Sequence, residues 1–449
     1  MAATRAKRVK RWPLEGLLLV LMLLASPEVQ AASDLSNEAK AAFRYLNKQR
    51  IDAGMIAFRW NPILERAARN HAIYLKENNF YSHLQFADKP HFTGVKPGDR
   101  AIAQGYHTHY VTENFSSGGK DPLKSVDGLM GAIYHRFGFL DFTKDEIGIA
   151  LIPSGNQYWM VFNMGNRGIN KLCQFAIHTG QEESFRDLCK QVRLVSAKKV
   201  RTLEAETARL NRAVIQWPPD QARGIPPAFY DEIPDPLPAA DLSGYPVSLQ
   251  FNPVLYNQIE LETFTLTTQE NQPVEPVFLM KKHNDPHRIL NRHQFALFPL
   301  KRLKWGTTYH ARVRYRHNGL SHKLDWTFTT KVLPYPVFVI AANAEALMIR
   351  PRQTYAVYFP PSDRHPYVES LSVEAPYSVQ VSVEWEDRNT LLLSANGERC
   401  QPVLFRLDHH RSFSIRLSRT DNLNTDHRYP ERSVKDCQSS KSAYDDTLD

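Results

Sequence analysis

The spacing of apolar residues changes character about halfway along this chain of 449 residues. Before residue 215, several segments have apolar side chains about every 3.6 residues, which places them on one face of a helix. From Gly244 onward they alternate with polar residues, as in half-buried strands. The stretch 217–238 holds seven prolines and indicates a stiff linker or the entry loop of a following domain. A chain this long needs several cores, so we expect an α+β domain followed by one or two β-sandwich-like domains.

Two helices are expected early in the segment 33–168. Ser36 can cap the first helix, which should end near Gly54. The second helix should begin at Asn61-Pro62, because Asn is a capping residue and Pro is preferred at the first helical position. Its apolar stripe includes His71, so this histidine is expected to be buried and hydrogen-bonded.

A third helix and a hairpin complete this segment. Asp121-Pro122 is a further start signal. The apolar stripe that follows predicts one continuous helix that carries His135, with Leu123, Val126, Met130, Ile133 and Phe137 on one face. The runs 147–152 and 158–164 flank a Pro-Ser-Gly-Asn-Gln turn and predict a β-hairpin.

The remaining chain divides by the same criteria. We expect a helical connector with a cysteine pair at 169–215, a β-sandwich at 216–332, a second all-β domain at 333–418 and a polar tail at 419–449.

The N-terminus has the composition of a secretory signal. A basic segment ends at Arg11, the apolar run Leu17–Ala25 follows, and small residues precede a cleavage point after Ala31. The run is much shorter than the roughly 20 residues that span a bilayer. We therefore expect a signal peptide at 1–31, with an uncleaved anchor as the alternative. The mature protein is then exported, periplasmic or extracellular, and has no transmembrane segment.

The net charge of +9 does not by itself exclude any class of binding partner. Five basic and two acidic side chains in residues 1–31 account for +3 of it, which leaves +6 for the mature chain. That charge fits loose attraction to anionic polymers or, as we favour, an ordinary solvated surface. The sequence contains no phosphate-binding glycine loop and no nucleic-acid module, so we expect no nucleic-acid partner.

The four cysteines indicate disulfides, because an exported chain meets oxidising conditions. Three pairings are possible, and proximity in sequence favours Cys173 with Cys189 and Cys400 with Cys437. A four-cysteine zinc site would need short paired spacings, which the sequence lacks.

Seven short motifs in order resemble the CAP domain (cysteine-rich secretory protein, antigen 5, pathogenesis-related 1) in its bacterial secreted, SCP-like subgroup. The resemblance covers residues 38–165. The motifs are Leu46-Asn47 with Arg50, His71-Ala72, Ser82-His83, Arg100 with Gly105-Tyr106, Glu113-Asn114, Asp127-Gly128 with His135-Arg136, and Ile147-Gly148-Ile149. The resemblance implies an α-β-α sandwich with a small antiparallel sheet and a cleft on one side.

By this resemblance, His83, Glu113 and His135 line the cleft. Two imidazoles and one carboxylate could hold a zinc ion with an open position for water, and such a zinc could support hydrolysis. A hydrogen-bond network that holds the cleft together is the alternative. The second cleft histidine of animal and plant relatives is absent around Glu146. Glu146 could supply a second carboxylate, although a charge at a strand edge is the interpretation we favour.

Residues 215–331 resemble bacterial Ig-like domains of cell-surface proteins. The supporting motifs are Phe298-Pro299-Leu300, Leu303, Gly306-Thr307-Thr308-Tyr309 and Trp326-Thr327-Phe328-Thr329-Thr330. Tyr309 is expected to form a tyrosine corner and Trp326 to lie in the core.

Two functions from different classes follow from the sequence. The first is a non-enzymatic module of the cell envelope, whose cleft binds a small ligand, a lipid or a cell-wall glycan and whose β-domains are spacers. The second is a zinc-dependent hydrolase that uses His83, Glu113 and His135.

Overall fold

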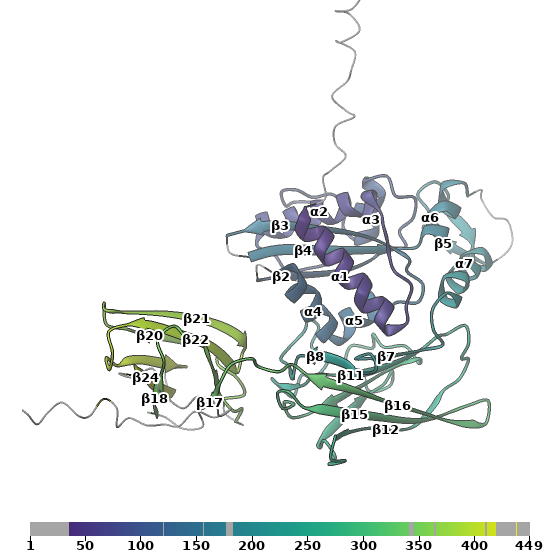
Figure 1. Ribbon diagram of the computed structural model, residues 1–449. Coiled ribbons are helices and arrows are strands. Elements are labelled where there is room, and N and C mark those ends of the chain that lie inside the picture. The colour runs from purple at the N-terminus through teal and green to yellow at the C-terminus, as the bar shows by residue number, and fades with distance from the viewer. Residues whose placement is uncertain are drawn as a thin grey trace, which may run out of the picture.

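The computed structural model describes residues 36–119, 121–155, 157–176, 183–340, 345–362, 365–408, 411–418 and 437. It comprises an α-β-α domain and two β-sandwiches, in line with the expected α+β class (Figure 1). The expected signal peptide at 1–31 lies outside the described residues, as does the tail 419–449 except for Cys437. Within the described ranges, no helix is both long and apolar enough to cross a membrane.

The α-β-α domain is built on a four-stranded sheet of order β1-β3-β4-β2. Its elements are α1 (Asn37–Ala53), β1 (Arg59–Trp60), α2 (Pro62–Asn78), α3 (Pro97–Ala103), β2 (Thr112–Ser117), α4 (Pro122–Gly131), α5 (Ile133–Phe139), β3 (Glu146–Ser154) and β4 (Gln157–Gly165). The expected hairpin is β3–β4. One face of the sheet packs against α2 and the other against α1, α4 and α5 (Figure 1).

The first two helices begin and end where the local signals indicate. The Ser36 side chain accepts a hydrogen bond from the Ala39 amide, and Gly54 ends α1 in the left-handed conformation. The Asn61 side chain caps α2 by accepting from the backbone amides of Ile63 and Leu64.

The expectation of one continuous helix through His135 is wrong. The chain turns to an extended conformation at Ala132, between α4 and α5, so His135 belongs to a separate short helix. A break of this kind leaves carbonyls of the first helix and amides of the second without helical partners. The Arg136 side chain donates to the Met130 carbonyl at 2.6 Å and to the Gly131 carbonyl at 3.4 Å, which offsets the loss on one side of the break.

The connector is only partly helical. It consists of α6 (Arg167–Gln174), β5 (Ser184–Arg186), β6 (Leu194–Ser196) and α7 (Ala197–Arg209). The Cys173–Cys189 disulfide closes it, and the second disulfide joins Cys400 to Cys437. This is the pairing that proximity favoured.

The first β-sandwich has two four-stranded sheets, of order β13-β14-β11-β7 and β12-β15-β16-β8, and a separate β9–β10 pair. Its strands are β7 (Val214–Trp217), β8 (Ala222–Ile225), β9 (Ala228–Phe229), β10 (Ser243–Gly244), β11 (Val247–Phe251), β12 (Glu260–Thr268), β13 (Val277–Met280), β14 (Gln294–Pro299), β15 (Thr308–His317) and β16 (Leu320–Thr330). Trp326 is buried, and the Tyr309 hydroxyl accepts a hydrogen bond from the Lys304 amide at 2.9 Å, which is the contact of a tyrosine corner.

The sheet that contains β11 is covered on both faces. Val247, Leu249 and Phe251 point into the sandwich core, as their alternation predicts. The intervening Ser248 and Gln250 are also buried, because the α-β-α domain covers them. Ser248 accepts a hydrogen bond from Arg136 at 3.0 Å, and Gln250 donates to the Leu140 carbonyl at 2.7 Å. The two domains therefore share one buried junction, which Figure 1 shows between α4, α5 and β11.

The second β-sandwich has its own core and two sheets, β17-β19-β22-β21 and β18-β24-β23-β20. Its strands are β17 (Val337–Val339), β18 (Glu345–Ile349), β19 (Tyr355–Tyr358), β20 (Leu371–Glu374), β21 (Val379–Asp387), β22 (Thr390–Gly397), β23 (Val403–Leu407) and β24 (Arg411–Leu417).

Polar contacts join this second sandwich to the first one. The Tyr230 hydroxyl donates to the Asn389 side chain at 3.0 Å. Lys331 forms an ion pair with Glu386 at 2.5 Å, and Arg302 forms one with Asp387.

Replacing Arg136 should weaken the whole junction. Arg136→Met keeps much of the apolar stem but leaves the buried acceptors around the guanidinium unsatisfied, so we expect the free energy of unfolding to fall by about 3 kcal/mol. Chemical denaturation monitored by tryptophan fluorescence measures the change. Arg314→Met, at an exposed position on β15, is the matched control and should change stability little. Equal effects of the two substitutions would contradict the role given to Arg136.

Candidate functional site

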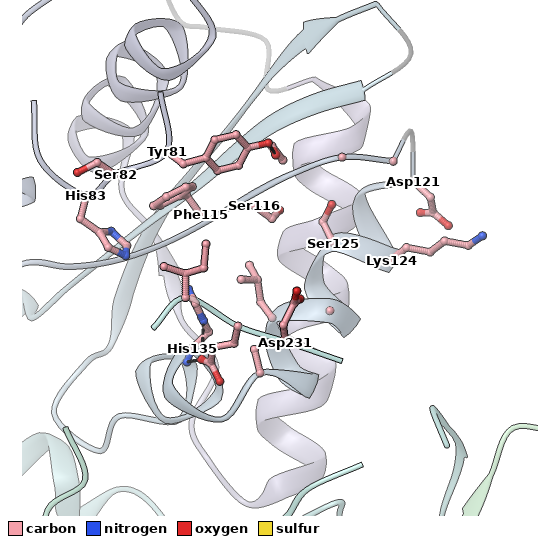
Figure 2. A pocket seen from close by; sticks show the side chains of 18 residues that line it. Tyr81, Ser82, His83, Phe115, Ser116, Asp121, Lys124, Ser125, His135 and Asp231 are labelled. Carbon is pink, nitrogen blue, oxygen red and sulfur yellow. Dashed lines mark hydrogen bonds and ion pairs between the residues drawn. The ribbon is translucent and has the colours of Figure 1, made fainter. Parts of the chain in front are cut away.

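A cleft of about 550 Å³ opens on one side of the α-β-α domain. Its lining residues lie within 81–83, 115–119, 121–135 and 231–233. Figure 2 shows His83 beside Phe115 and Tyr81 on one wall and His135 near Asp231 on the other. The last segment belongs to the Pro-rich stretch and not to the α-β-α domain, so the cleft is built from two parts of the chain.

Glu113 is the buried centre of the first wall. It lies on β2, and both of its carboxylate oxygens have partners. Oε1 accepts from His83 Nδ1 at 3.0 Å, and Oε2 accepts from Arg100 Nη2 at 2.7 Å. In the amide orientation that satisfies both of its ends, Asn163 also donates to Oε2 at 3.0 Å.

These contacts keep Glu113 ionised. Burial alone would raise the pKa of Glu113, but the positive charges nearby and the hydrogen bond from His83 outweigh it and lower the pKa to about 2. Arg100 is fully buried beside the carboxylate and is the constant positive charge of this group.

His71 lies behind this pair and is buried, as its place on the apolar stripe predicts. Burial lowers the pKa of His71 to about 4, so the ring is neutral near pH 7. The contacts assign its tautomer: Nε2 donates to the Ser82 carbonyl at 3.1 Å, and Nδ1 accepts from the Gln85 side chain at 3.0 Å. His71 therefore supports the loop that carries His83 and does not face the cleft as a ligand.

His83 has the geometry of an oriented imidazole. Its side chain is 43% exposed, while its Nδ1 is tied to the fully buried Glu113 carboxylate. Because Nδ1 donates to the carboxylate, Nε2 on the opposite side of the ring is the nitrogen that can accept a hydrogen bond. The ring also packs edge-on against Phe115, with centroids 4.8 Å apart, which restricts its rotation.

His135 has a similar arrangement on the other wall, but its partner was missed by sequence reasoning. Its Nδ1 lies 2.8 Å from Glu232 Oε1, and its side chain is 13% exposed. The two residues are 97 positions apart, and the sequence around Glu232 indicates only a Pro-rich linker. The run Tyr230-Asp231-Glu232 within that linker was the one available hint of a polar function.

Glu146 does not line the cleft. It is buried at the start of β3, where it accepts from the Tyr106 hydroxyl at 2.5 Å and from Asn61 Nδ2 at 2.9 Å. Burial raises the pKa of Glu146. It links β3 to the capping residue of α2, which is a structural role and not that of a second cleft carboxylate.

The residues present do not fit the zinc site that the sequence suggested. In the described part of the chain, no group of three or more His, Cys, Asp or Glu side chains is placed to hold a metal ion. A zinc ion on Glu113 would also compete with Arg100 for Oε2. Metal binding by His83, Glu113 and His135 thus stays a prediction without geometric support.

The fold and the cleft together define a class: an α-β-α sandwich with oriented histidines in a lateral cleft. The model of the cysteine-rich secretory protein family matches residues 43–164. This part of the chain is a CAP domain, and a β-sandwich of two four-stranded sheets follows it.

Three similar solved structures each cover between 28% and 30% of this chain. An outer surface protein of Borrelia burgdorferi is 21% identical over 30% of this chain and 96% of its own, with a TM-score of 0.27. An extracellular SCP-domain protein of Bacillus anthracis is 20% identical over 28% of this chain and 40% of its own, with a TM-score of 0.25. Venom allergen-like protein 4 of Schistosoma mansoni is 16% identical over 29% of this chain and 90% of its own, with a TM-score of 0.22. No curated protein matches the chain.

The buried His71 gives stability a specific pH dependence. Its folded pKa of about 4 is below the ordinary 6.5, so below pH 6.5 the unfolded chain takes up a proton that the folded chain refuses. Stability is therefore lost as pH falls from about 6.5 to about 4, by about 3 kcal/mol. Glu113 acts in a lower window, since its contribution is lost only as pH falls from about 4.5 toward 2.

Chemical denaturation at several pH values tests this with His71→Gln, whose amide nitrogen can replace Nε2 in the bond to Ser82. The variant should be less sensitive to pH than the wild type between pH 6.5 and 4. Parallel stability curves for the two proteins over that interval would show that His71 is not the titrating group.

Proposed function

We propose that this is an exported protein whose CAP domain binds a small ligand in the cleft between His83 and His135, without catalysing a reaction. The observation that supports the proposal most directly is the cleft itself, with one carboxylate-oriented imidazole on each wall. The two disulfides support export, because such bonds persist in oxidising compartments. The second β-sandwich is proposed as a spacer in the cell envelope.

The lining of the cleft favours a hydroxyl-rich ligand with an apolar face. Phe115, Leu129 and Ile233 supply apolar surface, and the imidazoles supply acceptors. At the mouth, Lys124 is accompanied by acidic side chains, including Asp121, so the cleft has no excess of positive charge for an anionic head group. We therefore propose a neutral saccharide of the cell-wall glycan type, with a lipid as the competing outcome.

Two of the hydroxyl groups that line the cleft already have partners. Ser82 Oγ accepts from the Leu84 amide at 2.9 Å, and Ser117 Oγ is hydrogen-bonded to the Tyr81 hydroxyl. Each histidine pairs with a carboxylate instead, at His83–Glu113 and His135–Glu232. A catalytic triad has the same carboxylate at Nδ1 but also a hydroxyl at Nε2. Within the described residues neither His83 nor His135 is hydrogen-bonded to a hydroxyl, which favours binding over nucleophilic catalysis.

Gly128 allows the cleft to be blocked without disturbing the fold. It lies within α4 and lines the cleft, and a Cβ added there would meet no atom within 4 Å. Gly128→Leu should fill the cleft and lower saccharide affinity at least about tenfold, equivalent to 1.4 kcal/mol. Gly128→Ala is the matched control and should retain binding. Both variants should be at least as stable as the wild type, because glycine weakens a helix interior.

Isothermal titration with a chitin tetrasaccharide measures the effect, with dihexanoylphosphatidylcholine below its micellar concentration as the lipid probe. Saccharide binding that Gly128→Leu leaves intact would place the site elsewhere. Binding of the lipid alone would replace the glycan proposal.

Zinc titration tests the hydrolase alternative. Because Arg100 and Asn163 contact Glu113 Oε2, we expect no zinc binding in the micromolar range by the wild-type protein. Micromolar binding that is lost in both His83→Ala and His135→Ala would instead support a metal-dependent hydrolase.

A further inference from the structure

We infer that Glu232, which lies outside the CAP domain, is the positioning residue for His135, so that the binding site consists of the CAP domain and the loop 230–242 of the first β-sandwich together. This inference deepens the proposed function and rests on it for the ligand, but not for the geometry of His135. Four observations carry it.

The loop 230–242 is anchored at both ends. It leaves β9 and returns at β10, and these two strands pair through Phe229↔Ser243 and Ala228↔Gly244. Between its ends, Leu237 is buried in an apolar cluster with residues of α5 and β14. His287 Nε2 also lies 2.8 Å from the Asp235 carbonyl oxygen. These contacts therefore fix the loop in the position that brings Glu232 next to His135.

The Glu232 carboxylate takes three hydrogen bonds through one oxygen. Oε1 accepts from the backbone amides of Tyr134 and His135 at 2.9 and 3.1 Å, and from His135 Nδ1 at 2.8 Å. The two amides lie at the start of α5, where the break at Ala132 removes their helical partners. Glu232 thus satisfies the beginning of this helix and the ring of its third residue at the same time.

Three consecutive residues of α5 bond to the first β-sandwich. Tyr134 donates from its hydroxyl to Asp285. His135 bonds to Glu232, and Arg136 donates to the Pro246 carbonyl at 2.7 Å. Because these contacts diverge from adjacent positions, the sandwich fixes both the place and the rotation of the helix that carries His135.

The consequence for the ligand concerns the direction of hydrogen bonds. With Nδ1 of His135 donating to Glu232, the nitrogen left to face a ligand as an acceptor is Nε2, as it is in His83 beside Glu113. The cleft then presents acceptors from both walls, which suit the hydroxyl donors of a saccharide. Glu232 Oε2 is buried and has no hydrogen-bond partner within the described residues. All the hydrogen bonds to this carboxylate are therefore made through Oε1.

The imidazole nitrogens of the full chain, labelled with ¹⁵N-histidine, provide the test. Two-bond ¹H–¹⁵N correlation spectra should show the Nδ1–H tautomer for His135 in the wild type. In Glu232→Ala, the Nε2–H tautomer should appear, and affinity for the chitin tetrasaccharide should fall about tenfold. Glu232→Gln should restore the Nδ1–H tautomer, because its side-chain oxygen can still accept that proton. Asp241→Asn is the control and should change neither readout, since Asp241 lies in the same loop, is exposed and does not line the cleft.

The His83 signals show whether each variant retains the fold, because Glu113 orients that ring independently of Glu232. If Glu232→Ala does not fold, His135→Asn replaces it. The Asn amide can donate to Glu232 in place of Nδ1 but offers no acceptor at Nε2, so saccharide affinity should again fall about tenfold.

An Nδ1–H tautomer that persists in Glu232→Ala would overturn the inference, and so would an Nε2–H tautomer in the wild type. If the tautomer responds as expected but no saccharide binds the wild type, the proposed function fails while the role of Glu232 stands. If saccharide binds equally well to the wild type and His135→Asn, the site does not use the His135 acceptor, which overturns the inference and leaves ligand binding intact.

Discussion

The buried guanidinium of Arg136 is the interaction on which the rest of the structure depends. Burial lowers its pKa, and a charge taken out of water must be surrounded by acceptors to be tolerated. Those acceptors come from two domains: the carbonyls at the end of α4 on one side, and Pro246 with Ser248 on the other. The same contacts stabilise the break between α4 and α5 and fix the CAP domain on the sandwich. The direction of α5, and with it the placement of His135, depends on this side chain together with the contacts of Tyr134 and His135 to the sandwich.

Much of the fold could be predicted because its signals are local. The caps at Ser36 and Asn61 act within three residues, and the corner at Tyr309 acts over five. The break at Ala132 could not be predicted, because the apolar stripe continues through it and the stabilising contacts come from far away in sequence. The burial of Ser248 and Gln250 could not be predicted either. Alternation of apolar and polar residues along β11 indicates only one buried face of the strand, and the CAP domain covers the other face.

The candidate site likewise has one part that the sequence could predict and one part that depends on a contact from a distant segment. His83 and Glu113 were named from the CAP resemblance, and the structure joins them directly. His135 was also named, but its partner was not, because Glu232 is 97 residues away in a stretch whose composition indicates only a linker. The two pairs differ in their electrostatic surroundings. Glu113 has the Arg100 charge at 2.7 Å, whereas Glu232 relies on backbone amides and on His135 itself.

The joint between the two sandwiches gives the molecule a mechanical connection to its cleft. Tyr230 contacts the second sandwich through Asn389, and the guanidinium of Arg388 lies 5.7 Å from the centre of the Tyr230 ring. Glu232 follows two residues later in the same loop. A pulling force applied to the C-terminal sandwich would reach the first sandwich through the covalent segment 331–336 and, in addition, through this contact beside the residue that holds His135. In a protein tethered at that end, tension on the tether would load a contact that lies two residues from the carboxylate that orients a histidine of the cleft.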